Sequence, residues 1–439
     1  MKRSITSDII SWFYSKNRKP LILKGARQVG KTYLVENLAE PLGIEKVLTF
    51  DFKADESLKA IFSSTKDPKK IIDRLALKRG AKIEPGRHLV FFDEIQDCPD
   101  ALASLKYFAQ DMKDLHLISA GSHLGLVASE SSFPVGKVDF LSMVPLVFDE
   151  FVENCSPNIF QAWKEETEID EFIHEELVKL FFAYLTIGGL PELVAHFIDE
   201  GSKSSSLTEI RRLQKSLLEG YEGDFAKYSG TVNANHIHHV FRQIPRQLAQ
   251  YQDESVKKFK FSGVIPNQKG FDRIIGPLSW LSKSRLCIKT FIANRSGHPL
   301  LGYTKENFFK TYFFDVGLLN CALDIPPEAI FVPQLDSYKG FIVENFVAQE
   351  LFAKKGSELV AWKEGQSEVE FLVNSGSDII PIEVKAAKRA RRAKSLYTYI
   401  EKYNPKTAYM LSLEKPEQKR GLITRRAIYE VAQMVSPEA

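Results

Sequence analysis

One segment near the N-terminus constrains this chain more than any other, Gly25-Ala26-Arg27-Gln28-Val29-Gly30-Lys31-Thr32. It fits the pattern G-x-x-x-x-G-K-[ST], in which the backbone N–H groups of a loop surround phosphate groups at the N-terminus of a helix. Residues 19–24 predict a short buried strand before it, and residues 33–40 predict a helix after it. This strand–loop–helix context is the one that the motif requires, so a chance glycine-rich turn is the weaker interpretation.

The residue types in this segment point to triphosphate chemistry. Gly25 and Gly30 permit backbone conformations that a Cβ atom would hinder. Lys31 would reach the β- and γ-phosphates of a nucleotide, and the hydroxyl of Thr32 would ligate Mg²⁺. We therefore predict that the chain binds ATP and Mg²⁺. The predicted nucleotide contacts are Gly25, Ala26, Arg27, Gln28, Val29, Gly30, Lys31, Thr32 and Tyr33.

An acidic pair follows this loop at a distance of about sixty residues. That position after a phosphate-binding loop favours a role for the pair in nucleotide chemistry. The apolar residues 89–92 predict a strand that is buried on both faces, and Asp93 and Glu94 end it. Asp93 would meet the Mg²⁺ shell, while Glu94 would polarise the attacking water. The alternative is a solvated Asp-Glu pair at a strand end.

A polar residue at the end of a neighbouring strand could contact the γ-phosphate. The next predicted strand, residues 116–120, is followed by Gly121 and Ser122. Ser122 is the first candidate for this catalytic contact and Ser119 the second, although either could be a serine in a tight turn. A helix is predicted at residues 55–79, and a last strand is predicted at residues 144–148. Alternating strands and helices predict a parallel, three-layer α/β domain.

Length and composition set the outer bounds. The chain has 439 residues, too many for one core, so two or three domains are expected. Its net charge of +3 gives no global electrostatic argument for nucleic acid. Four scattered cysteines predict free thiols rather than a zinc site or disulfides. Because neither a signal-peptide core nor a membrane-spanning stretch is recognised, we predict a cytoplasmic protein without a membrane partner.

Four strings together resemble one family: GARQVGKT, LVFFDEIQD, AGSHLGL and VPLVFDEF. They are similar to prokaryotic AAA-type P-loop ATPases whose C-terminal part is a domain of unknown function. That family carries Gly-Arg shortly before a Pro-Leu-Ser-Phe segment, whereas this chain has Gly136-Lys137, so an arginine-finger role is not expected at Lys137. AAA-type sites are often completed by a neighbouring subunit, so the resemblance is compatible with an oligomer.

The middle of the chain is predicted to be mainly helical. The turn at residues 187–192 resembles a family signature in the helical lid. Helices followed by strands at residues 287–291 and 300–303 give the order of a winged helix, to which this part of the family is compared. A structural or protein-interaction module remains an equal alternative. The local basic residues are Arg242, Arg246, Lys257, Lys258, Lys260 and Lys269, and His236, His238 and His239 are expected on a helix surface rather than around a metal.

The C-terminal part contains a second candidate site. A helix is predicted at residues 340–351, and two strands that could form a hairpin are predicted at residues 368–373 and 379–385. Glu383 and Lys385 share one face of a strand because the side-chain period is two. With Glu344 and Glu370 they resemble the PD-(D/E)xK nuclease constellation, in which carboxylates hold Mg²⁺ and the lysine assists water attack. The resemblance is incomplete because nuclease sites usually carry Asp where this chain has Glu370. The basic residues that follow, at 385–394, could contact a phosphate backbone or form a solvated helix face.

Together these patterns predict an α/β protein with three parts. They are a parallel-sheet P-loop, AAA-like ATPase core (residues 1–155), a helical lid and winged-helix-like region (156–305) and an α/β nuclease-like domain (306–439). The predicted function is Mg²⁺-dependent ATP binding and hydrolysis, coupled to a DNA or protein partner. Two alternatives stay open: an ATP-regulated DNA nuclease, and a nucleotide switch that does not hydrolyse ATP.

Overall fold

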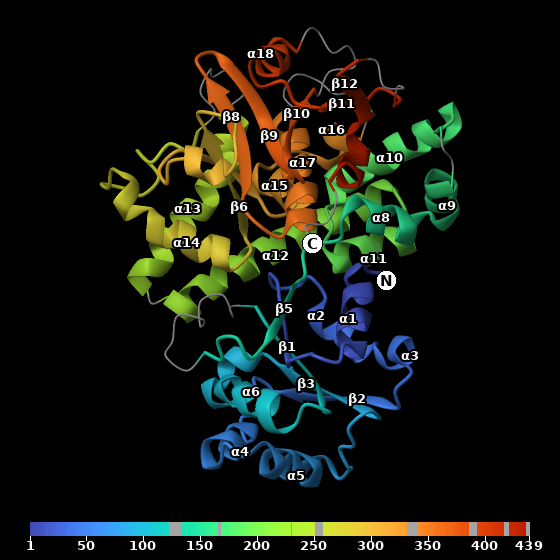
Figure 1. The fold of residues 1–439 in the computed structure, drawn as a ribbon, viewed down its shortest axis with the longest axis vertical. Coiled ribbons are helices and arrows are strands. Elements are labelled where there is room, and N and C mark those ends of the chain that lie inside the picture. The colour runs from blue at the N-terminus through green and yellow to red at the C-terminus, as the bar shows by residue number, and fades with distance from the viewer. Residues whose placement is uncertain are drawn as a thin grey trace. The chain divides into compact units, whose positions relative to one another are not determined.

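The computed structural model of the chain consists of two compact units, Met1–Val144 and Pro145–Ala439 (Figure 1). Each unit is described by itself below. The residues described are 1–122, 133–165, 168–229, 231–250, 258–331, 340–385, 393–416 and 421–435. Most of the basic stretch after Lys385 and Lys257 of the predicted winged helix therefore lie outside the described residues, as does part of the AGSHLGL string.

Unit 1 is built on a five-stranded parallel sheet in the order β2-β3-β4-β1-β5. Its strands are β1 (Leu21–Lys24), β2 (Lys46–Asp51), β3 (His88–Asp93), β4 (His116–Gly121) and β5 (Asp139–Ser142). Its helices are α1 (Ile5–Tyr14), α2 (Lys31–Glu36), α3 (Ala39–Leu42), α4 (Leu58–Ser64), α5 (Pro68–Arg79) and α6 (Pro99–Asp111), with the 3₁₀ helix η1 (Ile95–Asp97). This arrangement confirms the predicted parallel sheet with helices.

Aromatic packing on β3 explains why this strand is so apolar. Phe92 is fully buried and makes edge-to-face contacts with Phe52, Phe62 and Phe108, with ring centroids 5.4 to 6.1 Å apart. Such pairs add about 0.5–1.5 kcal/mol each to the free energy gained by burying apolar area. The rings pack β3 against α4 and α6, so the strand that ends in Asp93 is held on a rigid core.

Three local predictions for unit 1 need correction. The predicted helix at residues 55–79 is two helices, because Pro68 begins α5 and Asp67 caps it by accepting the backbone N–H of Lys69 at 3.0 Å. The predicted helix at 33–40 is likewise divided, into α2 and α3. The strand predicted at residues 144–148 is wrong, since β5 ends at Ser142 and Phe148 already begins α8. Pro145 lacks the N–H group that a central strand needs.

Unit 2 contains a seven-stranded mixed sheet in the order β12-β11-β10-β9-β8-β6-β7. Its strands are β6 (Cys287–Ala293), β7 (Phe309–Phe313), β8 (Leu359–Glu364), β9 (Ser367–Ser375), β10 (Asp378–Val384), β11 (Ala408–Ser412) and β12 (Ile423–Ala427). The predicted hairpin is confirmed, because β9 and β10 pair antiparallel across a short turn at residues 376–377. The sheet itself does not establish the nuclease-like fold that the sequence predicted.

Helices cover much of this sheet. They are α8 (Phe148–Cys155), α9 (Pro157–Glu165), α10 (Glu171–Ile187), α11 (Pro191–Glu200), α12 (Ser204–Ser229), α13 (Thr231–Gln250), α14 (Ile275–Lys283), α15 (Val316–Ala322), α16 (Pro327–Phe331), α17 (Gly340–Lys355) and α18 (Lys394–Tyr403), with 3₁₀ helices η2 (Phe271–Arg273), η3 (Leu300–Tyr303) and η5 (Ile428–Gln433). Long helices at residues 171–250 and 340–355 agree with the predicted helical character of these segments.

The predicted winged-helix hairpin is wrong in its second strand. Residues 300–303 form the 3₁₀ helix η3, while β6 pairs antiparallel with β7 and parallel with β8. β6 therefore belongs to the same sheet as the C-terminal strands rather than to a separate wing. The division at residues 155 and 305 stays a prediction, and all the residues from Pro145 onward cluster in one compact unit.

A junction of glycines around one carboxylate joins α10 to α15. Asp315 is fully buried; its Oδ2 accepts the N–H of Gly189 at 2.8 Å and its Oδ1 accepts that of Leu318 at 2.9 Å. A Cβ atom on Gly188 would lie 2.2 Å from Oδ1 of Asp315, and one on Gly317 would lie 2.3 Å from the carbonyl oxygen of Ile187. Only glycine fits this approach, which explains the Gly-Gly turn noted in the sequence.

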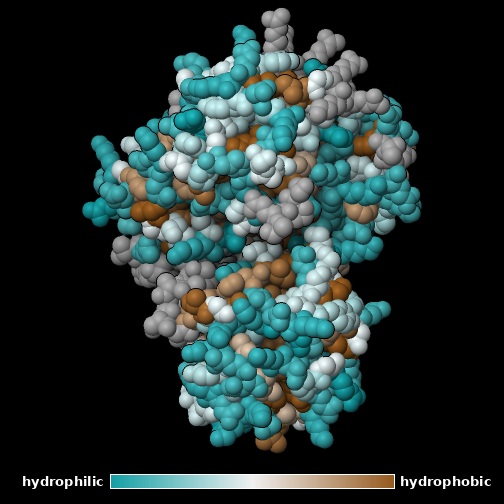
Figure 2. All heavy atoms as spheres, in the orientation of Figure 1, coloured by the Kyte–Doolittle hydropathy of each residue, from teal (hydrophilic) through white to brown (hydrophobic). Residues whose placement is uncertain are grey.

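The surface drawn in Figure 2 is largely hydrophilic, with hydrophobic residues in small groups. Large side chains that stay exposed include Tyr14, Leu77, Val135 and Phe172. Among the described residues, no helix has both the length and the apolar character needed to cross a bilayer.

Candidate functional site

The predicted phosphate loop lies between β1 and α2. Gln28 and Gly30 both have left-handed backbones, with φ of 62° and 89°. Gly25 permits a close approach, because a Cβ atom there would lie 2.4 Å from the carbonyl oxygen of Met143. Tyr33, the last of the predicted contacts, lies on α2 and is 62% exposed. The loop is therefore shaped by backbone conformations and contacts that larger residues would prevent.

Arg3, which the sequence did not single out, supports the loop through a hydrogen bond to its backbone. The guanidinium of Arg3 donates to the carbonyl oxygen of Val29 at 3.0 Å through Nη1, and to that of Val144 at 2.6 Å through Nη2. Arg3 is 9% exposed and Val29 is fully buried. A single arginine close to the N-terminus has no sequence pattern that would single it out.

Lys31 points back into the loop. Its ammonium donates to the carbonyl oxygens of Gly25 at 3.0 Å and Ala26 at 2.7 Å. Burial lowers the pKa of Lys31 to about 8, although the nearby carboxylates of Glu94 and Asp93 oppose the shift. A phosphate group would offer this ammonium a full negative charge instead of carbonyl dipoles, so the site favours an anionic ligand.

Thr32 and Asp93 form the next part of the site. Oγ1 of Thr32 donates to Oδ2 of Asp93 at 2.6 Å, and the backbone N–H of Glu94 donates to Oδ1 at 2.9 Å. Burial raises the pKa of Asp93, and the hydrogen bond from Thr32 opposes the shift. Both carboxylate oxygens thus have fixed directions. Asp51, which sequence reasoning missed, is aligned with Asp93 on the neighbouring strand.

These oxygen atoms fit a magnesium ion. The hydroxyl of Thr32 keeps its lone pairs while it donates its proton, and the carboxylate of Asp93 keeps further acceptor capacity. Mg²⁺ prefers hard oxygen ligands and usually takes one or two from the protein, with the rest from phosphates and water. Within the described ranges, no cluster of three or more His, Cys, Asp or Glu residues could hold a metal. A Thr–Asp pair matches the smaller protein contribution.

Glu94 lies directly after β3 with an unusual backbone. Its φ of 48° is left-handed, which is uncommon for a residue with a side chain. Its Oε2 accepts a hydrogen bond from Nε2 of Gln96, which is 7% exposed. The structure therefore brings Lys31, Asp93 and Glu94 into one neighbourhood, as the sequence predicted from their spacing alone.

One serine candidate lies in β4 and the other directly after it, and β4 lies between β1 and β3. Ser119 is aligned with Ile22 on β1 and Phe92 on β3, inside the sheet, and is fully buried. Ser122 follows Gly121, the last residue of the strand, and is 7% exposed. Because the loop leaves the carboxyl end of β1, Ser122 is the better placed of the two for a contact with its ligand.

A cavity of about 550 Å³ opens beside Thr32 and Asp93. Acidic groups from α2, β2 and the following loop line it together with two basic residues from α5. Lys78 is paired with Asp55 at 2.9 Å, and Arg79 donates to the carbonyl oxygen of Thr49 at 2.8 Å. Both basic residues are thus engaged, and the acidic residues that line the cavity outnumber them.

The C-terminal candidates also come together, but around a lysine that sequence reasoning missed. The ammonium of Lys310, on β7, lies 3.0 Å from Oε1 of Glu344 and 2.6 Å from Oε1 of Glu368. The hydroxyl of Tyr312 donates to the same Glu344 oxygen at 2.5 Å. Oε2 of Glu370 accepts the backbone N–H of Val384 at 3.2 Å. These contacts use the carboxylates in a protein-internal network.

Charge pairing neutralises much of this cluster. Burial by itself would lower the pKa of Lys310, but Glu344 and Glu368 outweigh it and raise the pKa well above its ordinary value. Lys385 is paired with Glu383, and its pKa is raised by the carboxylates around it despite partial burial. The four predicted residues are therefore neighbours, and the ammonium of Lys310 lies beside Glu344 in the same cluster of charges.

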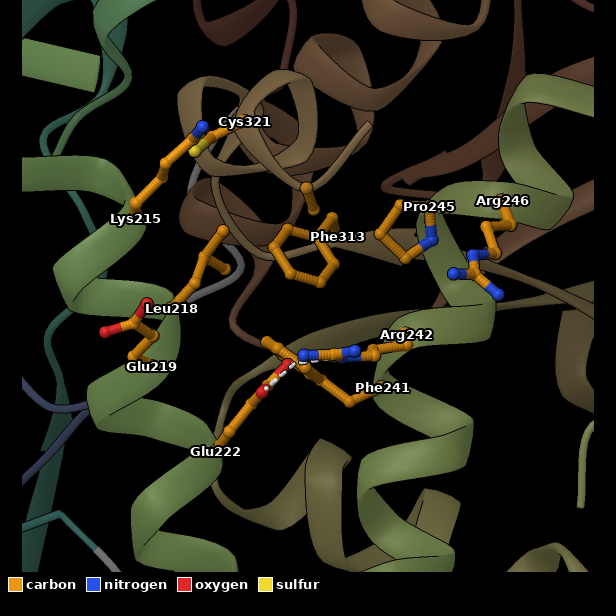
Figure 3. Close-up of a pocket in the computed structure, with 11 residues that line it drawn as sticks. Lys215, Leu218, Glu219, Glu222, Phe241, Arg242, Pro245, Arg246, Phe313 and Cys321 are labelled. Atoms are coloured by element: carbon orange, nitrogen blue, oxygen red, sulfur yellow. Dashed lines mark hydrogen bonds and ion pairs between the residues drawn. The ribbon is translucent and has the colours of Figure 1, made fainter. Parts of the chain in front are cut away.

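A second cavity, of about 230 Å³, lies between α12 and α13 in unit 2 (Figure 3). Its main charged pair is Glu222 with Arg242, whose Nε and Nη2 donate to the carboxylate at 2.8 and 2.9 Å. His238 lies 3.1 Å from the same carboxylate. These pairings account for one of the three predicted surface histidines and one of the basic residues without a metal or nucleic acid.

Comparisons with known proteins support an AAA-type fold for the N-terminal part of the chain. The model of a family described as an AAA domain matches residues 17–152. Two further models, each described as a domain of unknown function, match residues 178–329 (DUF8612) and 339–429 (DUF4143). The predicted AAA-type P-loop domain and C-terminal domain of unknown function are thus supported. No curated protein matches the chain.

Three solved structures align with the chain at low TM-scores. The Walker-type ATPase Paby2304 of Pyrococcus abyssi aligns at 16% identity and a TM-score of 0.47, covering 73% of this chain and 95% of its own. The Aeropyrum pernix Orc1 protein in complex with DNA aligns at 13% identity and 0.29, covering 74% and 91%. Caenorhabditis elegans PCH-2 aligns at 14% identity and 0.26, covering 48% and 61%. At these scores the alignments identify no function.

Proposed function

We propose that unit 1 binds ATP with Mg²⁺ and hydrolyses it. The observation that carries the proposal is the convergence of Lys31, the Thr32–Asp93 pair and Glu94 at one end of a parallel sheet. Lys31 would exchange its two carbonyl contacts for the β- and γ-phosphates. Thr32 and Asp93 would hold the ion through hydroxyl and carboxylate oxygens.

Each remaining group has a defined part in the reaction. Glu94 accepts a proton from the water that attacks the γ-phosphorus, and the bond to the bridging oxygen breaks, which releases ADP and phosphate. Lys31 stabilises the charge that develops on the phosphate oxygens, and Ser122 orients the γ-phosphate or the water. Bound Mg²⁺ supplies further charge stabilisation.

Replacement of Glu94 by Gln tests the proposal. We expect turnover to fall by a factor of about 10²–10⁴, the usual contribution of a general base, while the dissociation constant for ATP changes little. Glu56→Gln is the matched control, because the side chain of Glu56 is 84% exposed and its carboxylate pairs with Lys59 on the surface. If wild-type protein binds ATP without turning it over, alone or with a partner, the nucleotide-switch alternative replaces hydrolysis.

We further propose that turnover responds to a macromolecular partner bound by unit 2. DNA and protein are both candidates, and oligomerisation would provide a third kind of contact. ATPase rates with and without DNA, measured beside the molar mass in solution, separate these cases. A rate that neither DNA nor self-association changes would leave a protein partner as the remaining candidate.

The nuclease alternative has weaker support. Glu344 is paired with buried Lys310 and Glu383 with Lys385, so a metal bound to these two carboxylates would compete with both ammonium groups. Metal-dependent nicking of DNA that disappears in Lys385→Ala would nevertheless establish it. Without nicking on linear, supercoiled and single-stranded DNA, the alternative should be abandoned.

A further inference from the structure

The turn after β3 fixes a glutamine beside Glu94. The 3₁₀ helix η1 starts immediately after Glu94, and the N–H of Asp97 donates to the carbonyl oxygen of Glu94 at 2.9 Å. Ile95 is fully buried and anchors the turn in the core. The side chain of Gln96 is thereby directed back to Glu94, where its Nε2 donates to Oε2.

The carbonyl oxygen of the Gln96 carboxamide lacks a hydrogen-bond donor within the described part of the chain. Oε1 of Gln96 is buried and has no hydrogen-bond partner among the described residues. A buried acceptor left in this state costs about 1–3 kcal/mol, so its position is costly unless a donor arrives. A water molecule beside Glu94 is such a donor, since one O–H can point to each of the two side chains.

We infer that Gln96 is a positioning residue for Glu94 and for the attacking water, an inference that rests on the proposed hydrolysis. Its N–H holds the carboxylate of Glu94 in one direction. Its carbonyl oxygen accepts one O–H of the water, and Glu94 takes the other proton as the water oxygen bonds to the γ-phosphorus. The bond from that phosphorus to the bridging oxygen breaks in the same reaction.

Two substitutions separate positioning from simple packing. Gln96→Glu keeps nearly the same volume but replaces the N–H donor by a second carboxylate, which repels Glu94. Gln96→Ala removes both the volume and the donor. If Gln96 positions Glu94, both variants lose roughly tenfold to a hundredfold in kcat with little change in KM, and the Glu variant loses more. If Gln96 only fills space, Gln96→Glu keeps its activity, which would overturn the inference.

A double-mutant cycle measures the coupling between Gln96 and Glu94 in catalysis. A purely structural role of Gln96 would give no such coupling. In the Glu94→Gln background, Gln96→Ala should cost much less than in the wild type, because the carboxylate that Gln96 positions has gone. An undiminished loss in that background contradicts the inference. Gln110→Glu is the matched control, since Gln110 is exposed on α6.

Failure of hydrolysis itself can be told apart from failure of positioning. Protein labelled with ¹⁵N in its glutamine side chains gives an amide signal for Gln96, assigned by its loss in Gln96→Glu. This signal should shift in Glu94→Ala without any nucleotide present. Absence of turnover in the wild type refutes the proposed hydrolysis, whereas an unmoved amide signal refutes the contact on which positioning depends.

Discussion

Replacement of Gly317 by Ala should lower the stability of unit 2. The new Cβ atom would lie 2.3 Å from the carbonyl oxygen of Ile187, 2.4 Å from its carbonyl carbon and 2.5 Å from the nitrogen of Gly188. Real Cβ atoms essentially never approach other atoms closer than 3.0 Å. Because the obstacle is backbone, no side-chain rotation can relieve the contact.

The cost follows from what has to move. Overpacking of this kind costs about 1–3 kcal/mol. Separation of α10 from α15 also strains the bond from Gly189 to Asp315, and hydrogen bonds to charged groups contribute about 1.5–3 kcal/mol. The better helix propensity of Ala returns up to about 1 kcal/mol. We therefore expect a net loss of roughly 2–4 kcal/mol in the free energy of unfolding of unit 2.

Urea unfolding followed by tryptophan fluorescence measures this loss. Trp12 is the one tryptophan in the sequence of unit 1, so the substitution Trp12→Phe leaves a signal from unit 2 alone. With a slope near 3 kcal/mol per molar urea, the midpoint should fall by roughly 1 M. Gly220→Ala is the control, because a Cβ there meets nothing within 4 Å inside α12 and should stabilise slightly. Equal midpoints for the two variants would refute the reasoning.

Three further results are expected. Since the pKa of Lys31 lies at about 8, ATP affinity should fall above that pH by up to about tenfold per unit, with proton uptake in calorimetry, whereas constant affinity contradicts the shift. Burial raises the pKa of Asp315 to about 6, so the urea midpoint of unit 2 should fall as pH rises through 6. Asp315→Asn should abolish this dependence yet cost about 1–3 kcal/mol, because one N–H loses its acceptor. Lys310→Met should lower the free energy of unfolding by about 3–5 kcal/mol, partly restored by Glu344→Gln, and an unchanged midpoint would show that the ion pairs contribute little.

Local patterns in the sequence were sufficient to predict which residues of the first candidate site lie close together. The loop at residues 25–32 and the acidic pair at Asp93 carry short-range signals, because strand, turn and helix are each determined by neighbouring residues. The sheet order then brings them together, since parallel strands place their carboxyl ends at one edge. The hairpin of β9 and β10 was predictable for the same reason.

Long-range contacts left no local pattern. Arg3 meets Val144 across 141 positions of sequence, and Lys310 meets Glu344 across 34. The residues next to Arg3 and Lys310 in the sequence do not indicate which distant residues these side chains contact. The strand predicted at residues 300–303 is wrong for a related reason. β6 forms its backbone hydrogen bonds with β7 and with the distant β8, not with the nearest apolar segment.

Arg3 gives the first turn of the chain a mechanical role. One guanidinium bonds the carbonyl of Val29 in the phosphate loop and that of Val144, the last residue of unit 1. A planar group of fixed size cannot keep both bonds if the two carbonyls drift apart. The side chain of Arg3 therefore links the phosphate loop to Val144, where the chain leaves unit 1. Any N-terminal fusion or truncation that displaces Arg3 removes both hydrogen bonds at once.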